Sequence, residues 1–285
     1  MERIRVITDS TANLPKELIK KYNIIQVPFY FEIENKVYRD SIDITNEEIF
    51  KIFESKKFLE FKAYPPKVED FLDTYNKIEE EKIICITISS TISGCYKNAL
   101  IAKDLVLNKQ IEVIDSLNAG SGEGILTYKV IELIENNIPF NEIILNIKDL
   151  VNKIKTYVYI DSLKDVYRTG RIPKILSDFG ALLSLKPIVS IDFGKIKKVT
   201  LSKDRFDGIL KLIEIIKREI KENLIFCMHI NFKDEEIEFF KNEINKVFKE
   251  KKIYTVPFTP IMGYAVLTGA FGVSFIGGEK ENEGH

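Results

Sequence analysis

Three short clusters of hydroxyl and carboxyl side chains follow stretches of sequence that resemble strands. They are Thr8-Asp9-Ser10-Thr11, Ser89-Ser90-Thr91-Ile92-Ser93-Gly94, and Asp115-Ser116 followed by Gly120-Ser121-Gly122-Glu123-Gly124. Capping the next helix is the commonest role of such side chains. In open α/β sheets, however, ligands bind at the carboxyl ends of the strands. We interpret each cluster alone as a helix cap, and the three together as an indication of one cleft.

The middle cluster indicates the chemistry most clearly, because Ser93 and Gly94 stand where a helix is predicted to begin. The unpaired N–H groups of a first helical turn, together with a hydroxyl, can hold a carboxylate without a buried lysine. A fatty acid suits such a site, since its tail needs only an apolar tunnel. Residues available to line a tunnel are Phe179, Leu182, Leu183, Leu185, Ile188 and Val189, although core packing is their ordinary role.

Catalytic groups are sparse in the sequence. His229 lies in the apolar run Ile225–Ile230, and His285 belongs to what resembles the start of an expression tag. There is no Gly-x-Ser-x-Gly elbow, no phosphate-binding loop and no Gly-x-Gly-x-x-Gly motif. Cys85, Cys95 and Cys227 are widely separated, which favours neither disulfides nor zinc. We therefore predict a protein that is not an enzyme and that uses no cofactor or metal.

A turn in the second half, Tyr167–Pro173, contains Arg168 and Arg171. Guanidinium groups in this arrangement can contact an anion or a partner protein, and a solvated turn is the equally weighted alternative. We retain Arg171 as a candidate contact for a partner or an anion.

The overall charge recruits no particular class of macromolecule. The 42 Lys and Arg nearly cancel the 43 Asp and Glu, giving a formal net charge of -1. We expect no nucleic-acid partner. The N-terminus lacks a secretory signal pattern, which favours a cytoplasmic protein. Residues Phe258–Gly278 carry no formal charge, but Pro260 and several glycines favour buried turns and a core strand over membrane insertion.

The elements that must position these clusters alternate between strand and helix patterns, which is typical of an α/β fold with a mostly parallel sheet. The clearest predicted strands are Ile4–Thr8, Lys82–Ile88, Ile111–Ile114, Lys186–Ile191, Leu224–Ile230 and Val273–Ile276. The predicted helices are Pro66–Lys77, Ser93–Leu107, Phe206–Lys221 and Glu235–Lys249. The pattern changes near Asn152. We predict two α/β domains, residues 1–152 and 153–282, and a tag remnant at 283–285.

Several of these motifs, taken in order, resemble the DegV family over nearly the whole chain. They are Ile7–Pro15, Val27-Pro28, Ser90–Ala99, Val113–Ser116, Gly170-Arg171-Ile172 and Leu185–Ile188. The resemblance implies a fatty acid buried between two α/β domains, with the second domain lining the acyl tunnel.

In the family, a serine of a Ser-Gly motif and a threonine of a Thr-Ser-x-Pro-Ser motif hold the carboxylate. The serine corresponds to Ser93, whereas the stretch Ala63–Lys67 places Ala63 at the threonine position. Where relatives have His-Thr-Gly-Pro-Gly, this chain has Leu267-Thr268-Gly269-Ala270-Phe271. The carboxylate site implied by the resemblance comprises Ser93, Gly94, Ala63, Thr268 and Gly269.

The resemblance also implies a carrier in lipid metabolism, because well-understood members present the acid to a fatty acid kinase for phospholipid synthesis. We predict a long-chain fatty acid as ligand and a fatty acid kinase as a possible partner. A phosphoryl- or acyl-transfer enzyme on a related two-domain scaffold is the alternative.

Overall fold

Runs rich in β-branched residues build a parallel sheet in the first half of the chain. The computed structural model describes residues 2–55, 61–162, 186–248, 250–266 and 269–278. The strands of this sheet lie in the order β2 (Ile25–Val27), β1 (Ile4–Asp9), β6 (Lys82–Thr87) and β7 (Gln110–Asp115). All three neighbouring pairs are parallel.

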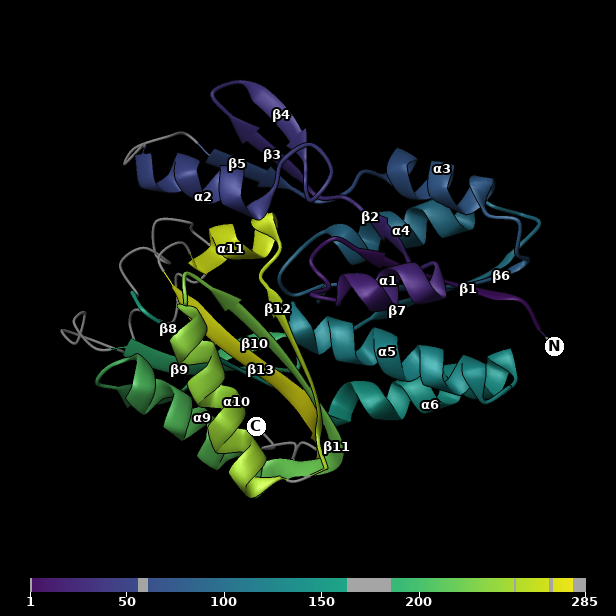
Figure 1. Cartoon of the computed structure of the whole chain (residues 1–285). Coiled ribbons are helices and arrows are strands. Elements are labelled where there is room, and N and C mark those ends of the chain that lie inside the picture. The colour runs from purple at the N-terminus through teal and green to yellow at the C-terminus, as the bar shows by residue number, and fades with distance from the viewer. Residues whose placement is uncertain (1, 56–60, 163–185, 249, 267–268, 279–285) are drawn as a thin grey trace, which may run out of the picture.

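Helices cover both faces of this sheet (Figure 1). They are α1 (Lys16–Tyr22), α3 (Val68–Lys77), α4 (Cys95–Asp104), α5 (Ser121–Glu135) and α6 (Phe140–Lys153). In β6, Ile83 and Cys85 share a buried core with α3 and α4. Ile84 and Ile86, which point to the opposite face, share a core with α1, α5 and α6. A nearly continuous apolar strand is what a parallel sheet covered on both faces requires.

The second large sheet is mixed and uses the second half of the chain. Its order is β10 (Lys195–Ser202), β9 (Lys186–Asp192), β8 (Ile154–Ile160), β13 (Ala270–Gly277), β11 (Ile220–Ile230) and β12 (Lys252–Pro257). β11 and β12 pair in parallel, and the other neighbours are antiparallel. Helices α9 (Arg205–Glu219) and α10 (Asp234–Val247) cover one face. Part of the other face packs against α5 and α6.

Buried hydroxyls help to hold α5 against the second sheet. Oγ of Ser121, in the first turn of α5, lies 2.7 Å from Oγ of Ser274 in β13. Oγ of Ser274 in turn lies 2.8 Å from Oγ1 of Thr156 in β8. The two large sheets are therefore connected through a helix that is packed against both, and the division at residue 152 stays a prediction.

A small antiparallel sheet and two helices complete the described fold (Figure 1). The sheet has the order β4 (Lys36–Arg39), β3 (Tyr30–Ile33) and β5 (Phe61–Tyr64), and it lies near α2 (Asn46–Ser55) and α11 (Pro260–Val266). No helix among the described residues is long and apolar enough to cross a membrane. The uncharged segment Phe258–Gly278 instead forms α11 and the fully buried strand β13 in its described part.

The predicted α/β fold class is confirmed. Element boundaries shift by a few residues: the helix predicted over Phe206–Lys221 ends at Glu219, because β11 begins at Ile220. The helix predicted from Ser93 begins at Cys95, with Gly94 as its N-cap. The sequence patterns did not predict the small sheet, whose strands are only four residues long.

Candidate functional site

The parallel sheet brings the three polar clusters to one edge, as predicted. β1, β6 and β7 are parallel neighbours, so their carboxyl ends meet. The N–H of Ile88, just after β6, donates to Oδ2 of Asp9 at the end of β1 over 2.8 Å. The N–H of Ser116, just after β7, donates to the carbonyl of Thr87 over 3.1 Å.

Next to this edge lies a largely apolar cavity of about 130 Å³ that opens to the surface. The second sheet contributes the wall Val158, Ile160, Val189, Ile191, Ile196 and Met228. Helix α11 contributes Ile261, Met262, Tyr264, Ala265 and Val266. The polar edge and small sheet contribute Thr11, Phe29, Ala63, Pro65, Ile88, Ile92, Ser93 and Ala119, and Phe258 also lines the cavity.

Ser93 is among the residues that line the cavity, and its role in binding a carboxylate stays a prediction. Its backbone N–H donates to the carbonyl of Ser89 over 3.1 Å. Its Oγ accepts a hydrogen bond from the N–H of Cys95 at 3.2 Å, which leaves the hydroxyl hydrogen able to donate. Gly94 is exposed and is not among the lining residues. The structure thus brings the serine hydroxyl to the cavity and places the adjacent glycine at the helix cap.

Ala63 also lines the cavity, at the end of β5 where its strand leaves the small sheet. Successive strand residues point to opposite faces. Accordingly, Tyr64 is 40% exposed and its hydroxyl donates to Oε2 of Glu32 over 2.8 Å. Tyr64 is not a lining residue, so its phenol does not replace a hydroxyl at position 63.

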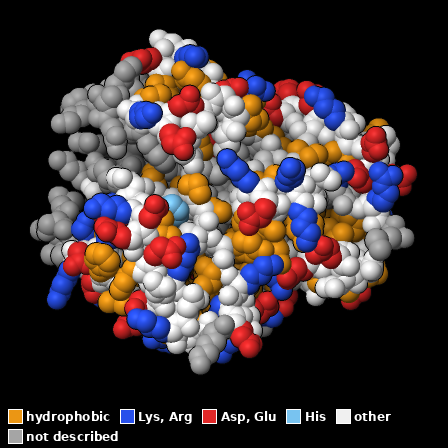
Figure 2. Space-filling view, viewed as in Figure 1, with side chains coloured by type: hydrophobic (Ala, Val, Ile, Leu, Met, Phe, Trp, Pro, Cys, Tyr) orange, Lys and Arg blue, Asp and Glu red, His pale blue; other side chains and the backbone are white. Residues whose placement is uncertain are grey.

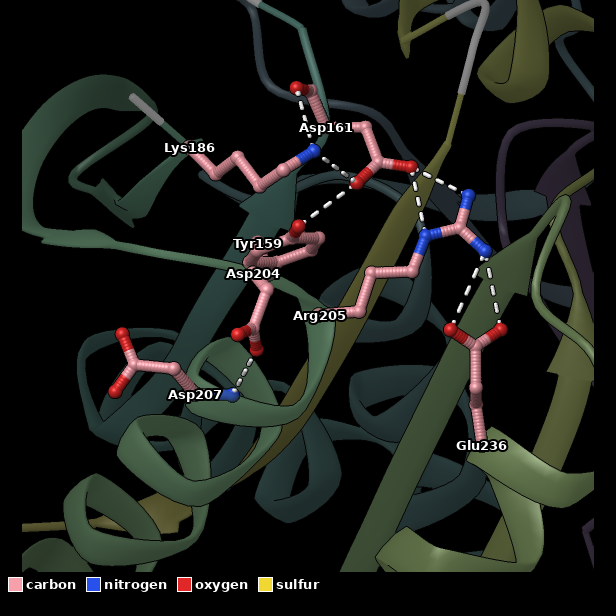
Figure 3. A network of polar contacts seen from close by, with 7 residues as sticks. All are labelled: Tyr159, Asp161, Lys186, Asp204, Arg205, Asp207 and Glu236. Carbon is pink, nitrogen blue, oxygen red and sulfur yellow. Dashed lines mark hydrogen bonds and ion pairs between the residues drawn. The ribbon is translucent and has the colours of Figure 1, made fainter. Parts of the chain in front are cut away.

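Gly269 lies in a different environment, a compact network of charged groups (Figure 3). Its carbonyl accepts the N–H of Asp161 at 2.8 Å. A Cβ at this position would overlap Oδ2 of Asp161, which accepts hydrogen bonds from Nε and Nη2 of Arg205 at 2.9 and 2.5 Å. Gly269 thus provides clearance for this ion pair and is not among the residues that line the cavity.

The same network joins the second sheet to the helices beneath it. Asp161 also accepts hydrogen bonds from Tyr159 and Lys186, and Arg205 contacts Glu236 at 3.0 Å (Figure 3). Burial would raise the pKa of Asp161, but the hydrogen bonds from Arg205, Tyr159 and Lys186 outweigh it and hold this pKa below its usual value. Asp161 is thus paired with Lys186 and Arg205, and Glu236 is paired with Arg205.

Two predicted site residues, Thr268 and Arg171, lie outside the described residues, as do Phe179, Leu182, Leu183 and Leu185. The side chains of Ile188 and Val189, which are adjacent in β9, point to opposite faces of the second sheet. Val189 lines the cavity, whereas Ile188 is buried in the opposite core with α9 and α10.

Two of the clusters named in the sequence meet in a buried polar triad, Asp9, Thr11 and Glu123, whose contacts with one another the sequence did not predict. Oγ1 of Thr11 lies 2.6 Å from Oδ1 of Asp9 and 2.7 Å from Oε2 of Glu123. Burial raises the pKa of Glu123 well above its usual range, and the nearby charge of Asp9 adds to this effect. The signal in the sequence was the presence of these residues in two polar clusters, each following a predicted strand.

His229 and Cys85, two reactive side chains named in the sequence, do not belong to the described lining of the cavity. Burial lowers the pKa of His229, which belongs to β11 and is not a lining residue. Burial raises the pKa of the Cys85 thiol to about 12, which disfavours a reactive thiolate. Within the described ranges, no three His, Cys, Asp or Glu side chains form a group suited to a metal ion.

Comparison with known proteins identifies relatives along the whole chain. A family model described as uncharacterised proteins of the DegV family matches residues 3–278. A DegV domain-containing protein of Clostridium acetobutylicum is 32% identical over 285 residues, covering 96% of this chain and 98% of the relative. One from Caldanaerobacter subterraneus subsp. tengcongensis is 30% identical over 256 residues, covering 88% of this chain and 89% of the relative.

Solved structures share the fold at lower sequence identity. DegV of Bacillus subtilis, a fatty acid-binding protein, has a TM-score of 0.86 at 22% identity, covering 98% of this chain and 100% of its own. The Fatty Acid Kinase (Fak) B3 protein of Streptococcus pneumoniae, loaded with linoleic acid, has a TM-score of 0.86 at 18% identity with the same coverage.

Proposed function

This chain belongs to the DegV family, and from this premise we propose that it binds one long-chain fatty acid in the cavity and carries or presents it. The observation that supports this most strongly is the cavity itself: an apolar space lined by α11 and the second sheet, with the few hydroxyl side chains Thr11, Ser93 and Tyr264 in its wall. Burial stabilises an acyl chain by about 0.8 kcal/mol per methylene, so such a wall favours a long tail.

The orientation of the ligand follows from the distribution of polar groups. Ser93 and the start of α4 lie beside the polar edge of the first sheet, whereas Val158, Val189 and Met228 lie on the apolar wall. We place the head group at Ser93 and Ala63 and the tail along the second sheet. Roles for Gly94, Thr268 and Gly269 at the head group, taken from the family pattern, stay predictions.

The carrier role includes a partner. The similarity to the Streptococcus pneumoniae kinase-associated protein supports presentation of the acid to a separate fatty acid kinase. Arg171 is the residue we assign to that contact or to an anion, and it lies outside the described residues. In this proposal the chain itself catalyses no reaction, works in the cytoplasm and supplies the substrate of another enzyme.

A cavity-filling substitution tests the proposed site. Val189→Trp places a large ring in the cavity and should abolish binding of palmitic acid, measured by displacement of a fluorescent fatty acid. Val199→Trp is the matched control, because Val199 is 37% exposed on the neighbouring strand β10 and should leave binding intact. Thermal unfolding of both variants would verify folding. Undiminished binding by folded Val189→Trp protein would contradict the placement of the ligand.

A further inference from the structure

The cavity wall offers no cation to a carboxylate among the described residues. Its polar groups are the hydroxyls of Thr11, Ser93 and Tyr264, and no Lys, Arg, His, Asp or Glu side chain of the described ranges belongs to the lining. An ionised head group would therefore leave water for a site with a few neutral donors, which is costly.

A buried carboxyl group, that of Asp9, lies directly behind this wall. Asp9 is fully buried and accepts hydrogen bonds from the N–H of Thr11 at 2.8 Å and the N–H of Ile88 at 2.8 Å. It also accepts from the thiol of Cys95, two residues after Ser93, at 3.2 Å. Thr11, Ile88 and Ser93 all line the cavity, so Asp9 stands one layer behind its polar end. Burial raises the pKa of Asp9, and its several donors oppose that effect by stabilising the carboxylate.

Hydrogen counting requires a proton on one of the two carboxyl groups, Asp9 or Glu123, and we assign it to Glu123. The hydroxyl of Thr11 has one hydrogen but lies within hydrogen-bonding distance of carboxyl oxygens of both Asp9 and Glu123. One carboxyl must therefore be the donor. Asp9 has several other donors, whereas Oε1 of Glu123 is buried without a partner. A protonated Glu123 that donates to Thr11, which in turn donates to Asp9, satisfies this geometry.

The described neighbours of this end include further carboxyl groups. Asp40, between β4 and α2, is buried beside Ile261 of α11, and Asp115 ends β7. The negative charge of Asp9 raises the pKa of Asp40 and of Glu123, and that of Asp115 also raises the pKa of Glu123. Cys85 and Cys95 are buried thiols, and α11 and the second sheet contribute no charged lining residue within the described ranges.

We propose that the cavity selects the neutral, protonated form of a long-chain acid over the carboxylate, and therefore also accepts neutral long-chain head groups such as alcohols. This inference rests on the proposed fatty-acid binding and names the charge state that the site recognises. Ser93 donates to the carbonyl oxygen of the acid, while the Asp9 charge behind the wall disfavours a second negative charge.

The protonation state of the bound acid can be observed directly by ¹³C NMR of palmitic acid labelled at its carboxyl carbon. In the complex with the full chain, the bound resonance should stay at the neutral-acid position above neutral pH, where the free monomeric acid is ionised. A bound resonance at the carboxylate position would overturn this inference and leave the proposed function intact. Absence of any bound resonance would contradict both.

Affinity measurements provide an independent readout. Between about pH 6 and about pH 9, affinity for palmitic acid should fall by about tenfold per pH unit, since each unit removes nine-tenths of the neutral acid. Hexadecan-1-ol, which does not titrate, should bind with constant affinity over the same range. A flat profile for the acid, or failure of the alcohol to bind, would overturn the selection of a neutral head group.

Two substitutions assign the effect to the buried pair. Asp9→Asn removes the charge behind the wall and should make the affinity for palmitic acid less dependent on pH. Because Asp9 has many partners, Glu123→Gln provides a milder second test: its amide can donate to Thr11 as the protonated carboxyl does, and the wild-type profile should persist. A flattened profile in folded Glu123→Gln protein would show that Glu123 is charged and would overturn the arrangement.

Discussion

At the residue scale, Ser93 was assigned to the carboxylate site from the sequence, and its side chain lines the cavity. Its hydroxyl hydrogen remains able to donate while its oxygen accepts from Cys95. Ser93→Ala should weaken fatty-acid binding by about 1 kcal/mol, or roughly fivefold, the usual net value of a neutral hydrogen bond. Isothermal titration with palmitic acid would measure this.

Ser90→Ala is the control for Ser93→Ala, because Ser90 is exposed in the same loop and does not line the cavity. Its affinity should equal that of the wild type. Equal losses in the two variants would show that the head group does not contact Ser93.

Ala63 provides the complementary test, in which a donor is added. Ala63→Thr places a hydroxyl at the polar end of the cavity and should tighten binding by about 1 kcal/mol, roughly fivefold. Ala63→Val has nearly the same shape without the hydroxyl and separates hydrogen bonding from packing. Tyr64→Phe should have no effect, since the Tyr64 hydroxyl contacts Glu32. If threonine and valine change affinity alike, the head group lies elsewhere.

At the scale of elements, the connection between β8, β13 and α9 depends on the small size of Gly269. A methyl group there would overlap Oδ2 of Asp161 and disturb the two hydrogen bonds that this oxygen accepts from Arg205. Gly269→Ala should therefore lower the free energy of unfolding by about 1–3 kcal/mol, the usual cost of overpacking, as measured by urea denaturation.

Gly278→Ala is the matched control for that substitution. The nearest heavy atom to a Cβ at Gly278 is Cε of Lys221, at 3.9 Å, which is an ordinary contact. Its stability should remain close to that of the wild type. If Gly269→Ala is equally stable and instead loses ligand affinity, Gly269 belongs to the head-group site as the family pattern implies.

The contact between α11 and the loop after β4 should depend on pH through Asp40. Its Oδ1 accepts the N–H of Ile261 at 3.1 Å, and burial raises the pKa of Asp40 from 3.8 to about 7. Between these values the folded state holds a proton that the unfolded state has lost. The contribution of Asp40 to stability is thus fully present below the lower value and is lost as pH rises through the higher one.

Asp40→Asn retains an acceptor for Ile261 and removes this titration. Compared with the wild type, the variant should gain relative stability as pH rises from about 5 to about 8, measured by urea denaturation at each pH. A stability difference that does not change with pH would mean that Asp40 titrates normally.

The elements show what the sequence could predict. Apolar runs followed by Ser, Thr and Asp predicted the parallel strands and their common polar edge, because both depend on local patterns. The direction of Tyr64 and the contribution of α11 could not be predicted, since they depend on which segments distant in the chain pack together. The buried position of Glu123 was equally inaccessible, because it depends on close packing at Gly122 and Gly124, where a Cβ would meet Asn118 and the backbone of Asn13.

At the scale of the whole molecule, two sheets and a helix line one cavity. The second sheet and α11 supply most of its apolar wall, and the segments after β1 and β6 supply the hydroxyl groups of Thr11 and Ser93. On the face in Figure 2, side chains of both charge signs are interspersed, in agreement with the formal net charge of -1. The groups that we expect to contact the ligand therefore lie inside the molecule. The mixed surface charge gives no strong overall electrostatic field that would attract a charged macromolecule.

The most direct test of the central claim is native mass spectrometry of the freshly purified protein. Each methylene that is buried in an apolar cavity stabilises the bound ligand, so the protein should retain an acyl ligand through purification. The account predicts a mass that exceeds the polypeptide by one long-chain fatty acid, and loss of this excess on denaturation, with the acid recovered in an organic extract. A polypeptide that carries no lipid, and that takes up neither palmitic nor oleic acid when these are added, would contradict the account.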